Sequence, residues 1–299
     1  MLKTFGRRLF GALGLVTAAG AALVPQAAEA RHAPALWSVS DADTTVYLFG
    51  TIHLLPDNYK WQTPALQKAV SSSQELVIET IIDEKNPQAL VATLMRMGLA
   101  SGLPPIAERV PPEKRAALDA AIAKSGVPRA AFDRMKTWAA AFMLLGNQYR
   151  DMGLKNGIGV EPVLKGEFTS EGKPVGELET NAEQLGFFDS LPEKAQRALL
   201  EGAVDTPHNS KAEFAGMLKA WQHGDVQAIA ETFNHDLSAS PELRDALLRR
   251  RNANWSRWIE ARMQKPGSLL IAVGAGHLAG TGSVVDLLQR DGYTVRRVQ

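Results

Sequence analysis

Two segments that lie far apart in the chain share one pattern: an apolar run that ends at a glycine, with a histidine three residues later. The first reads VYLFGTIH and ends at His53, and the second reads LLIAVGAGH and ends at His277. A loop, a stretch with helical spacing and a further β-branched run follow each of them. The chain therefore carries a strand, GxxH, helix, strand unit at each end, and this repetition limits the fold more than any other feature.

The two units favour a single sheet. Parallel strands need a crossover connection, and crossovers of one hand bring the ends of neighbouring parallel strands to the same edge. In the first unit, residues 36–40 and 45–49 predict a hairpin, residues 61–73 a helix and residues 75–80 a buried strand. In the second unit the corresponding elements are residues 268–273, 283–289 and 293–298.

Between the units, the sequence is mostly helical. Helical spacing with Pro, Ser or Gly at the ends predicts helices at 87–100, 112–124, 130–149, 192–203, 211–222, 226–233 and 241–264. Residues 158–164 and 173–180 read as a second hairpin-like pair of strands. We expect a mixed α/β (α+β) fold with a central mixed sheet and a large helical insertion at about 84–264, all in one domain from 31 to 299.

The first thirty residues resemble an export signal. A positive start with Lys3 and paired arginines at 7 and 8 precedes an apolar stretch at 10–24 and an Ala-Glu-Ala cleavage signal at 28–30. We expect a periplasmic or secreted protein without stable membrane insertion. An uncleaved anchor is the alternative, and the RRLF stretch leaves twin-arginine export open beside ordinary secretion.

Charge and cysteine content exclude several classes of protein. Cleavage removes three of the 33 basic residues and one of the 32 acidic residues, which leaves 30 and 31. Nothing then indicates a nucleic-acid footprint, because Lys and Arg are not concentrated on one stretch. The absence of cysteine excludes disulfides and thiolate metal sites. The oligomeric state stays open.

The paired motifs predict a metal site. Gly50 and Gly274 lack side chains and allow positive φ, so the backbone can turn sharply at the carboxyl edge of the sheet, where ligands usually bind. His53 and His277 then face that edge, and Glu79 emerges from the strand at 75–80 close to His53. Two imidazoles and a carboxylate are a common set of ligands for a divalent ion such as manganese, cobalt or zinc. A hydrogen-bonded structural role is the alternative for either histidine taken alone.

Several stretches together resemble the TraB/GumN family. They are LWSV followed by VYLFGTIHLLP, the ELVIET strand, GELET with Gln184-Leu185 after it, RRNANW at 250–255, and VGAGH followed by DGYTV. This family includes the animal Tiki proteases, and erythromycin esterase-like and haem-binding ChaN-like proteins are distant relatives in fold. The resemblance covers essentially all of residues 31–299. It implies a metal-dependent hydrolase in which His53 and His277 are the motif histidines and Glu79 is the acidic residue.

Four further residues are candidates for substrate binding or for support of the metal ligands. Glu161 and Glu179 are candidates for such a supporting role, or else they are exposed strand-end carboxylates. Arg251 and Asn252 lie on a predicted helix with two tryptophans. The forked guanidinium of Arg251 suits a substrate carboxylate or a developing oxyanion, and a solvated helix charge is the alternative.

The function that we expect is metal-assisted hydrolysis of a peptide or small-molecule substrate. A divalent ion lowers the pKa of a bound water and polarises a carbonyl, and Glu79 is either its third ligand or the general base. A protein of the same fold that binds a metal or haem without turnover is the alternative. A haem site would more readily use an apolar cleft with axial ligands.

Overall fold

Six strands form one mixed sheet in the computed structural model of this chain, which describes residues 33–83, 86–151, 159–204, 207–237 and 240–299. The strands are β1 (Leu36–Ser40), β2 (Thr44–Thr51), β3 (Glu75–Ile78), β4 (Val175–Glu177), β5 (Gly267–Gly274) and β6 (Val295–Arg297). Their order is β4-β3-β5-β2-β1-β6, and β1 runs opposite to the other five. The predicted mixed α/β fold with a central mixed sheet is confirmed.

The two strands that carry the GxxH motifs lie side by side. β2 pairs with β5 in parallel, with Gly50 opposite Val273 and Thr51 opposite Gly274. The predicted hairpin is also present, because β1 pairs antiparallel with β2 and places Leu36 opposite Phe49. Both motifs therefore leave the sheet at the same edge, as their context in the sequence predicts.

The closing strands of the two units take different places. β3 pairs with β5, so that β5 separates it from β2. β6 instead pairs antiparallel with β1 at the far edge of the sheet. The second unit thus inserts its motif strand into the first unit, and the two units are not a repeat in their strand pairing.

Helices cover both faces of the sheet, and the alternation along β5 shows how. Leu270 and Ala272 pack with α1 (Pro64–Ser72), α6 (Val160–Ser170), α9 (Pro207–Gln222) and α10 (Val226–Asp236). Leu269, Ile271 and Val273 point the other way and pack with α12 (Arg250–Met263) and α13 (Val284–Arg290). Successive strand residues face opposite sides, so a strand that is buried on both faces reads as a continuous apolar run.

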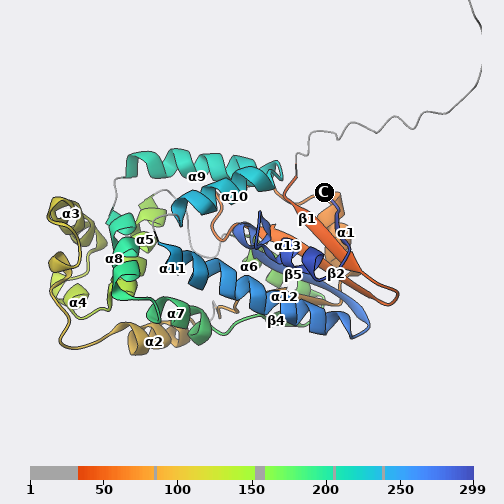
Figure 1. Ribbon diagram of the computed structural model, residues 1–299, viewed down its shortest axis with the longest axis horizontal. Helices are drawn as coiled ribbons and strands as arrows, with labels where there is room; N and C mark the ends of the chain where they lie inside the picture. The colour runs from red at the N-terminus through yellow and green to blue at the C-terminus, as the bar shows by residue number, and fades with distance from the viewer. Residues whose placement is uncertain (1–32, 84–85, 152–158, 205–206, 238–239) are drawn as a thin grey trace, which may run out of the picture. The chain divides into compact units, whose positions relative to one another are not determined.

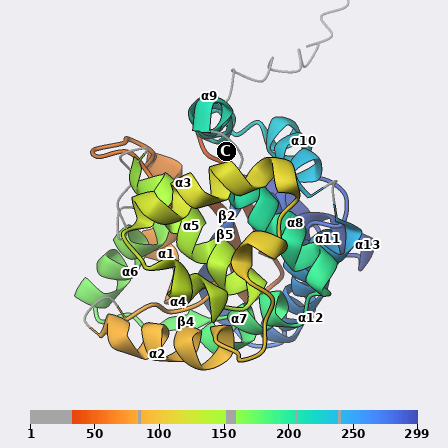
Figure 2. The ribbon, with the colours of Figure 1, turned by 90° about the vertical axis from the view of Figure 1, so that its left-hand side faces the viewer.

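A second apolar core lies in the helical region. It is formed mainly by α3 (Arg115–Ser125), α4 (Arg129–Asp133), α5 (Thr137–Asp151) and α8 (Glu193–Val204), with α2 (Pro87–Gly98) and α7 (Asn181–Asp189) packed beside them. The remaining helical elements are η1 (Ile106–Glu108), η2 (Pro112–Lys114), α11 (Pro241–Arg244), the π-helical turn η3 (Asp245–Arg249) and η4 (Ala275–Leu278). Figure 1 shows this helical end beside the sheet, and Figure 2 shows it from the helical side.

One predicted pair of strands is wrong. Of residues 158–164, those from 160 onward begin α6, and residue 158 lies outside the described residues. Val160, Leu164 and Phe168 recur every fourth residue and are buried on one face of that helix. Pro162 fits because the N–H groups of a first turn have no helical partner in any case. Its supposed partner contains β4, which pairs in parallel with β3.

Other boundaries also differ from the predictions. The stretch at 130–149 is split into α4 and α5, and α7 follows β4 directly. A capping box between Thr180 and Glu183 starts α7, and that signal is visible in the sequence. The predicted helix at 241–264 is present as α11, η3 and α12 in succession.

Contacts divide the chain into residues 1–30 and residues 31–299, and all the elements above belong to the second unit. The expected signal peptide at 1–30 lies outside the described residues. Among the described residues, no helix is long and apolar enough to cross a membrane.

Candidate functional site

Four neighbouring parallel strands each deliver one titratable side chain at the same edge of the sheet. In spatial order, Glu179 follows β4, Glu79 follows β3, His277 follows β5 and His53 follows β2. The ladder between β3 and β4 continues far enough for the N–H of Glu179 to bond the carbonyl of Glu79 at 2.9 Å. Parallel pairing therefore brings together residues that the sequence separates widely.

His53 lies in the loop after β2 and is held by a carboxylate from α6. Its Nδ1 is 2.7 Å from Oε1 of Glu161, which also accepts a hydrogen bond from the hydroxyl of Thr51. Gly159 makes this contact possible, because a Cβ there would lie 2.0 Å from the carbonyl oxygen of His53. With Nδ1 held by Glu161, it is Nε2 of His53 that faces the site.

His277 lies in η4 and is held by an amide from α12. Nδ2 of Asn252 donates to the carbonyl of Gly282 at 2.8 Å, which leaves its Oδ1 to accept from Nδ1 of His277 at 2.6 Å. The ring of Trp255 packs against the imidazole with 4.3 Å between centroids. Nε2 of His277 is therefore the acceptor nitrogen, and it faces the same space as Nε2 of His53 but is much more buried.

Glu79 lies between the two imidazoles. Its Oε1 is 4.0 Å from Nε2 of His53 and 3.9 Å from Nε2 of His277. The same oxygen accepts the N–H of Gly274 at 2.7 Å, and Oε2 accepts Nη2 of Arg251 at 2.7 Å. Two imidazole nitrogens and one carboxylate oxygen thus converge on a single small space.

The two motif glycines serve close packing. Neither has a positive φ, so the predicted role in a sharp positive-φ turn is wrong. A Cβ on Gly274 would lie 3.1 Å from Oε1 of Glu79 and 3.6 Å from Nε2 of His53, and so would fill the space between the ligands. A Cβ on Gly50 would press on Ala275 at 3.2 Å. The glycines let the two motifs touch each other and leave room between their histidines.

Arg251 is buried beside this space and uses all five of its N–H groups. Nε donates to both oxygens of Glu179 at 3.0 Å, and Nη2 reaches Glu179 at 2.8 Å as well as Glu79. Nη1 lies 3.2 Å from Nε2 of His277 and 3.5 Å from the carbonyl of Leu247. Its guanidinium also stacks 4.7 Å from the ring centroid of Trp255.

The pKa values of the two histidines are shifted in opposite directions. Desolvation by itself lowers the pKa of His53, but the charge and hydrogen bond of Glu161, aided by Glu79, raise it to about 9. Because 63% of the His53 side chain is exposed, water screens part of that attraction. Burial lowers the pKa of His277 to about 3, since Arg251 adds a positive charge and its Nδ1 partner is a neutral amide.

Glu79 is ionised in this setting. Burial by itself raises the pKa of Glu79, but the adjacent His277, His53 and Arg251 and the N–H of Gly274 outweigh burial and lower it to about 2. Burial raises the pKa of Glu179 above its usual value despite the hydrogen bonds from Arg251. The site therefore holds a carboxylate and a neutral imidazole, with His53 protonated below about pH 9.

Comparison with known proteins identifies the relatives of this chain. The family model described as the TraB/PrgY/gumN family matches residues 35–297. The chain belongs to the TraB/PrgY/gumN family. It is 26% identical over 243 residues to a protein of Escherichia coli strain K12 named "Uncharacterized protein YbaP", which covers 81% of this chain and 87% of the relative. The protein of the same name from Shigella flexneri has the same identity and coverage, and no solved structure matches.

The candidate ligands of this TraB/PrgY/gumN member fit a divalent ion in chemistry and orientation, but not yet in spacing. A tetrahedral ion with bonds of about 2.1 Å holds its ligand atoms about 3.4 Å apart, roughly half an ångström closer than the contacts of Glu79 Oε1. Accordingly, among the described residues no three His, Cys, Asp or Glu side chains already lie at the spacing that a bound metal ion requires. Both imidazoles do present the correct nitrogen, and each has the outer partner typical of metal-bound histidine.

Every residue predicted for the site lies in this one region of the TraB/PrgY/gumN fold. Glu161 and Glu179 are not exposed strand-end carboxylates, and Arg251 is not a solvated helix charge, because each contacts a candidate ligand or its neighbour. Thr51, Gly159 and Trp255 were missed. Thr51 lies within the first motif, and Trp255 is four residues after Arg251 and so shares its helix face, which were usable signals.

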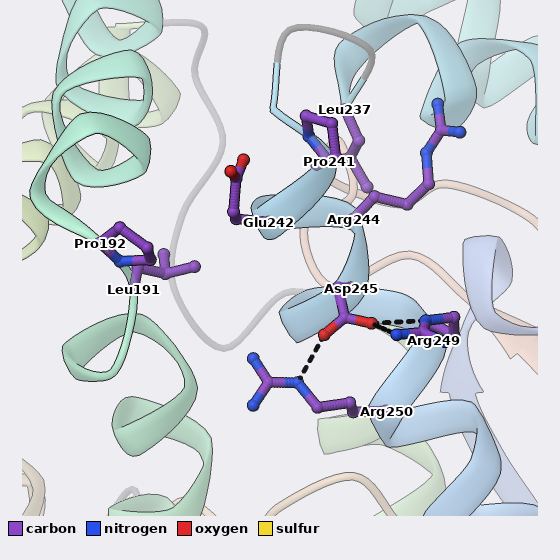
Figure 3. Close-up of a pocket in the computed structure, with 9 residues that line it drawn as sticks. All are labelled: Leu191, Pro192, Leu237, Pro241, Glu242, Arg244, Asp245, Arg249 and Arg250. Atoms are coloured by element: carbon purple, nitrogen blue, oxygen red, sulfur yellow. Dashed lines mark hydrogen bonds and ion pairs between the residues drawn. The ribbon is translucent and has the colours of Figure 1, made fainter.

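A cavity of about 620 Å³ in the helical region is separate from this constellation in the TraB/PrgY/gumN member. Figure 3 shows it between the α7–α8 turn, with Leu191 and Pro192, and the segment formed by α11, η3 and the first residue of α12. Its carboxylate Asp245 accepts Nε of Arg250 at 3.1 Å and is also paired with Arg249. None of its lining residues is a candidate ligand.

Proposed function

We propose that this protein is a metal-dependent hydrolase that cleaves an amide or ester bond, most simply in a peptide. The observation that carries the proposal is the convergence of Nε2 of His53 and Nε2 of His277 on Oε1 of Glu79, at 4.0 and 3.9 Å. Two neutral imidazoles with an adjacent carboxylate are typical of catalytic sites that keep coordination positions open for water and substrate.

His53, His277 and Glu79 are the residues that would hold a divalent ion such as manganese, cobalt or zinc. When bound there, such an ion supplies a water of lowered pKa and polarises the carbonyl that is attacked. The donor set contains no thiolate, so it does not favour soft metals.

Other side chains at the site would orient the ligands, transfer a proton and balance charge. Glu161 and Asn252 orient the imidazoles through their Nδ1 atoms. Glu79 is ionised, so it is able either to bind the ion or to take a proton from water as general base. Arg251 compensates the charges of Glu79 and Glu179, which burial would otherwise make costly.

Access to the site differs between its two sides. His53 exposes 63% of its side chain, whereas His277 exposes 8% and is covered by Trp255. A substrate therefore approaches from the His53 side. An open approach of this kind suits a peptide or another extended substrate more than a small molecule that must be fully enclosed.

The test is cleavage of a peptide library by purified protein loaded in turn with manganese, cobalt or zinc. The variants are His53→Ala and His277→Ala, and His223→Ala in the turn after α9 is the matched control because His223 bonds the carbonyl of Lys219 outside the site. We expect cleavage and stoichiometric metal in the protein and in the control, and neither in the two site variants. Metal that depends on both histidines without any cleavage would instead favour the metal-binding alternative.

We also propose export with removal of residues 1–30. The charged start, apolar stretch and Ala-Glu-Ala signal support it. N-terminal sequencing of protein recovered from the periplasm is expected to begin at Arg31. Replacing Arg7 and Arg8 together with lysine separates the routes, because twin-arginine export depends on the arginine pair and ordinary secretion needs only the charge.

A further inference from the structure

Arg251 occupies one atom that a metal ion would need, Nε2 of His277, and it holds Glu79 through the carboxylate oxygen that faces away from the imidazoles. Nη1 lies 3.2 Å from Nε2 of His277, and Nη2 lies 2.7 Å from Oε2 of Glu79. These are two of the three side chains proposed as ligands. A lone pair that accepts an N–H is not available to an ion at the same time, and a guanidinium beside the site repels a second cation.

The guanidinium of Arg251 also has hydrogen-bond partners that are not candidate metal ligands. Glu179 binds Nε with both of its oxygens at 3.0 Å and binds Nη2 at 2.8 Å. Those contacts alone keep the buried positive charge paired. Nη1 already lies 3.5 Å from the carbonyl of Leu247, one turn earlier on the same helix. Arg251 therefore has one set of partners that includes the candidate ligands and another that does not.

The spacing of the ligands agrees with this competition. The carboxylate of Glu79 is drawn to Arg251 through Oε2 and to the N–H of Gly274 through Oε1. Its Oε1 stays 3.9 to 4.0 Å from the imidazole nitrogens, which is too far for a common ion. Release from Arg251 would let the carboxylate turn toward the two histidines.

We propose that Arg251 is an internal competitor of the metal ion: it holds His277 and Glu79 in the ion-free protein and withdraws toward Glu179 and Leu247 when an ion binds. The inference rests on the metal site proposed above. It makes Arg251 a positioning residue that limits metal affinity and keeps the ion exchangeable.

Two neighbouring substitutions on α12 test the proposal because they should act in opposite directions. Arg251→Gln removes the competing charge, so its dissociation constants for zinc and manganese, measured by competition with a fluorescent chelator, are expected to fall at least tenfold. Asn252→Ala removes the Nδ1 partner of His277 and is expected to raise the same constants at least tenfold. General loosening of the site would weaken binding in both variants.

A second variant is needed in case Arg251→Gln does not fold, because that substitution leaves Glu79 and Glu179 without their cation. Arg251→Lys keeps one positive charge for the carboxylates but lacks the fork that also reaches His277. Folded Arg251→Lys, checked by circular dichroism, is expected to bind zinc at least threefold more tightly than the natural protein. A third readout is the nitrogen NMR signal of the Arg251 side chain, which should shift on zinc addition.

The outcomes separate the two proposals. If neither the natural protein nor a folded arginine variant binds zinc or manganese, the metal site itself fails. If the natural protein binds an ion but neither folded arginine variant binds it more tightly, Arg251 is no competitor and this inference is overturned while the metal site stands. Tighter binding by either variant, together with weaker binding by Asn252→Ala, supports it.

Discussion

Nδ1 of His277 lies 2.6 Å from Oδ1 of Asn252, a residue on α12, the helix that packs against one face of the sheet. The amide cannot be turned around without losing its bond to the carbonyl of Gly282. This pair therefore fixes the proton on Nδ1 of His277 and the lone pair on Nε2.

Asn252→Ala is predicted to weaken metal binding by about 10- to 100-fold, because the imidazole loses the acceptor that orients it. The buried Nδ1–H also loses its partner, which costs about 1–3 kcal/mol of folding free energy. Chelator competition and urea unfolding measure the two effects. Asn254→Ala on the exposed side of α12 is the matched control and should change neither. Unchanged metal affinity in Asn252→Ala would contradict the orienting role.

Glu161→Gln is predicted to lower the pKa of His53 from about 9 toward its usual range, since Glu161 is the main group that raises it. Titration of the histidine side chains by NMR, in protein stripped of metal with EDTA, measures this. Glu167→Gln serves as control, because Glu167 lies on the same helix but pairs with Gln62. A His53 pKa that is the same in both variants would remove Glu161 from this role.

The metal-free protein is predicted to be most stable near pH 6.5. The pKa of His53 is raised to about 9. The contribution of His53 to folding stability is therefore complete below its ordinary pKa of 6.5 and is lost as the pH rises through 9. The pKa of His277 is lowered to about 3, so the unfolded chain takes up a proton below pH 6.5 that the folded chain refuses. The free energy of unfolding therefore falls both above and below pH 6.5.

Glu79 adds to the acid side of this profile. Its pKa falls from 4.5 to about 2 on folding, so its contribution is present above pH 4.5 and is lost as the pH falls through 2. Urea unfolding from pH 2 to 10 measures the whole curve. His277→Gln should flatten it between pH 4.5 and 6.5, and Glu161→Gln should flatten it above 6.5. A natural protein whose stability is constant from pH 4.5 to 6.5 would refute the assignment to His277.

Gly274→Ala is predicted to abolish metal binding while the chain still folds. The added methyl group would lie 3.1 Å from Oε1 of Glu79 and between the two histidines, and the φ of −49° accepts alanine without strain. Overpacking of this kind costs about 1–3 kcal/mol. Gly202→Ala in α8 is the control, because a Cβ there meets nothing within 4 Å and should stabilise the helix slightly. Retained metal binding in Gly274→Ala would show that the space beside Gly274 is not where the ion binds.

Much of the sheet edge was predictable from the sequence because strand periodicity and motif context are local signals. The apolar runs before Gly50 and Gly274, and the parallel placement that follows from crossover connections, bring His53, His277 and Glu79 together as expected. The same reasoning failed at α6, where the β-branched run around Val160 resembles a strand and only the longer spacing to Leu164 and Phe168 marks a helix.

The electrostatic detail was not predictable. His53 and His277 occupy equivalent positions in similar motifs, yet the pKa of one is raised and the pKa of the other is lowered. The difference arises from Glu161 and Asn252, which come from helices far away in the sequence. No local pattern shows that Arg251 is buried against two carboxylates, because that follows from the tertiary packing of α12 on the sheet.

β5 lies between β2 and β3, and its last residue contacts Glu79 across 195 positions of sequence. During synthesis the ribosome therefore completes β2 and β3 long before the strand that separates them exists, and both present unpaired edges in the meantime. Loop closure over such a distance is slow, and open edges are prone to wrong pairing. A chain that lost residues 267–299 would keep most of its helices but lack the middle of its sheet, so a holding chaperone has most to protect in the unfinished chain.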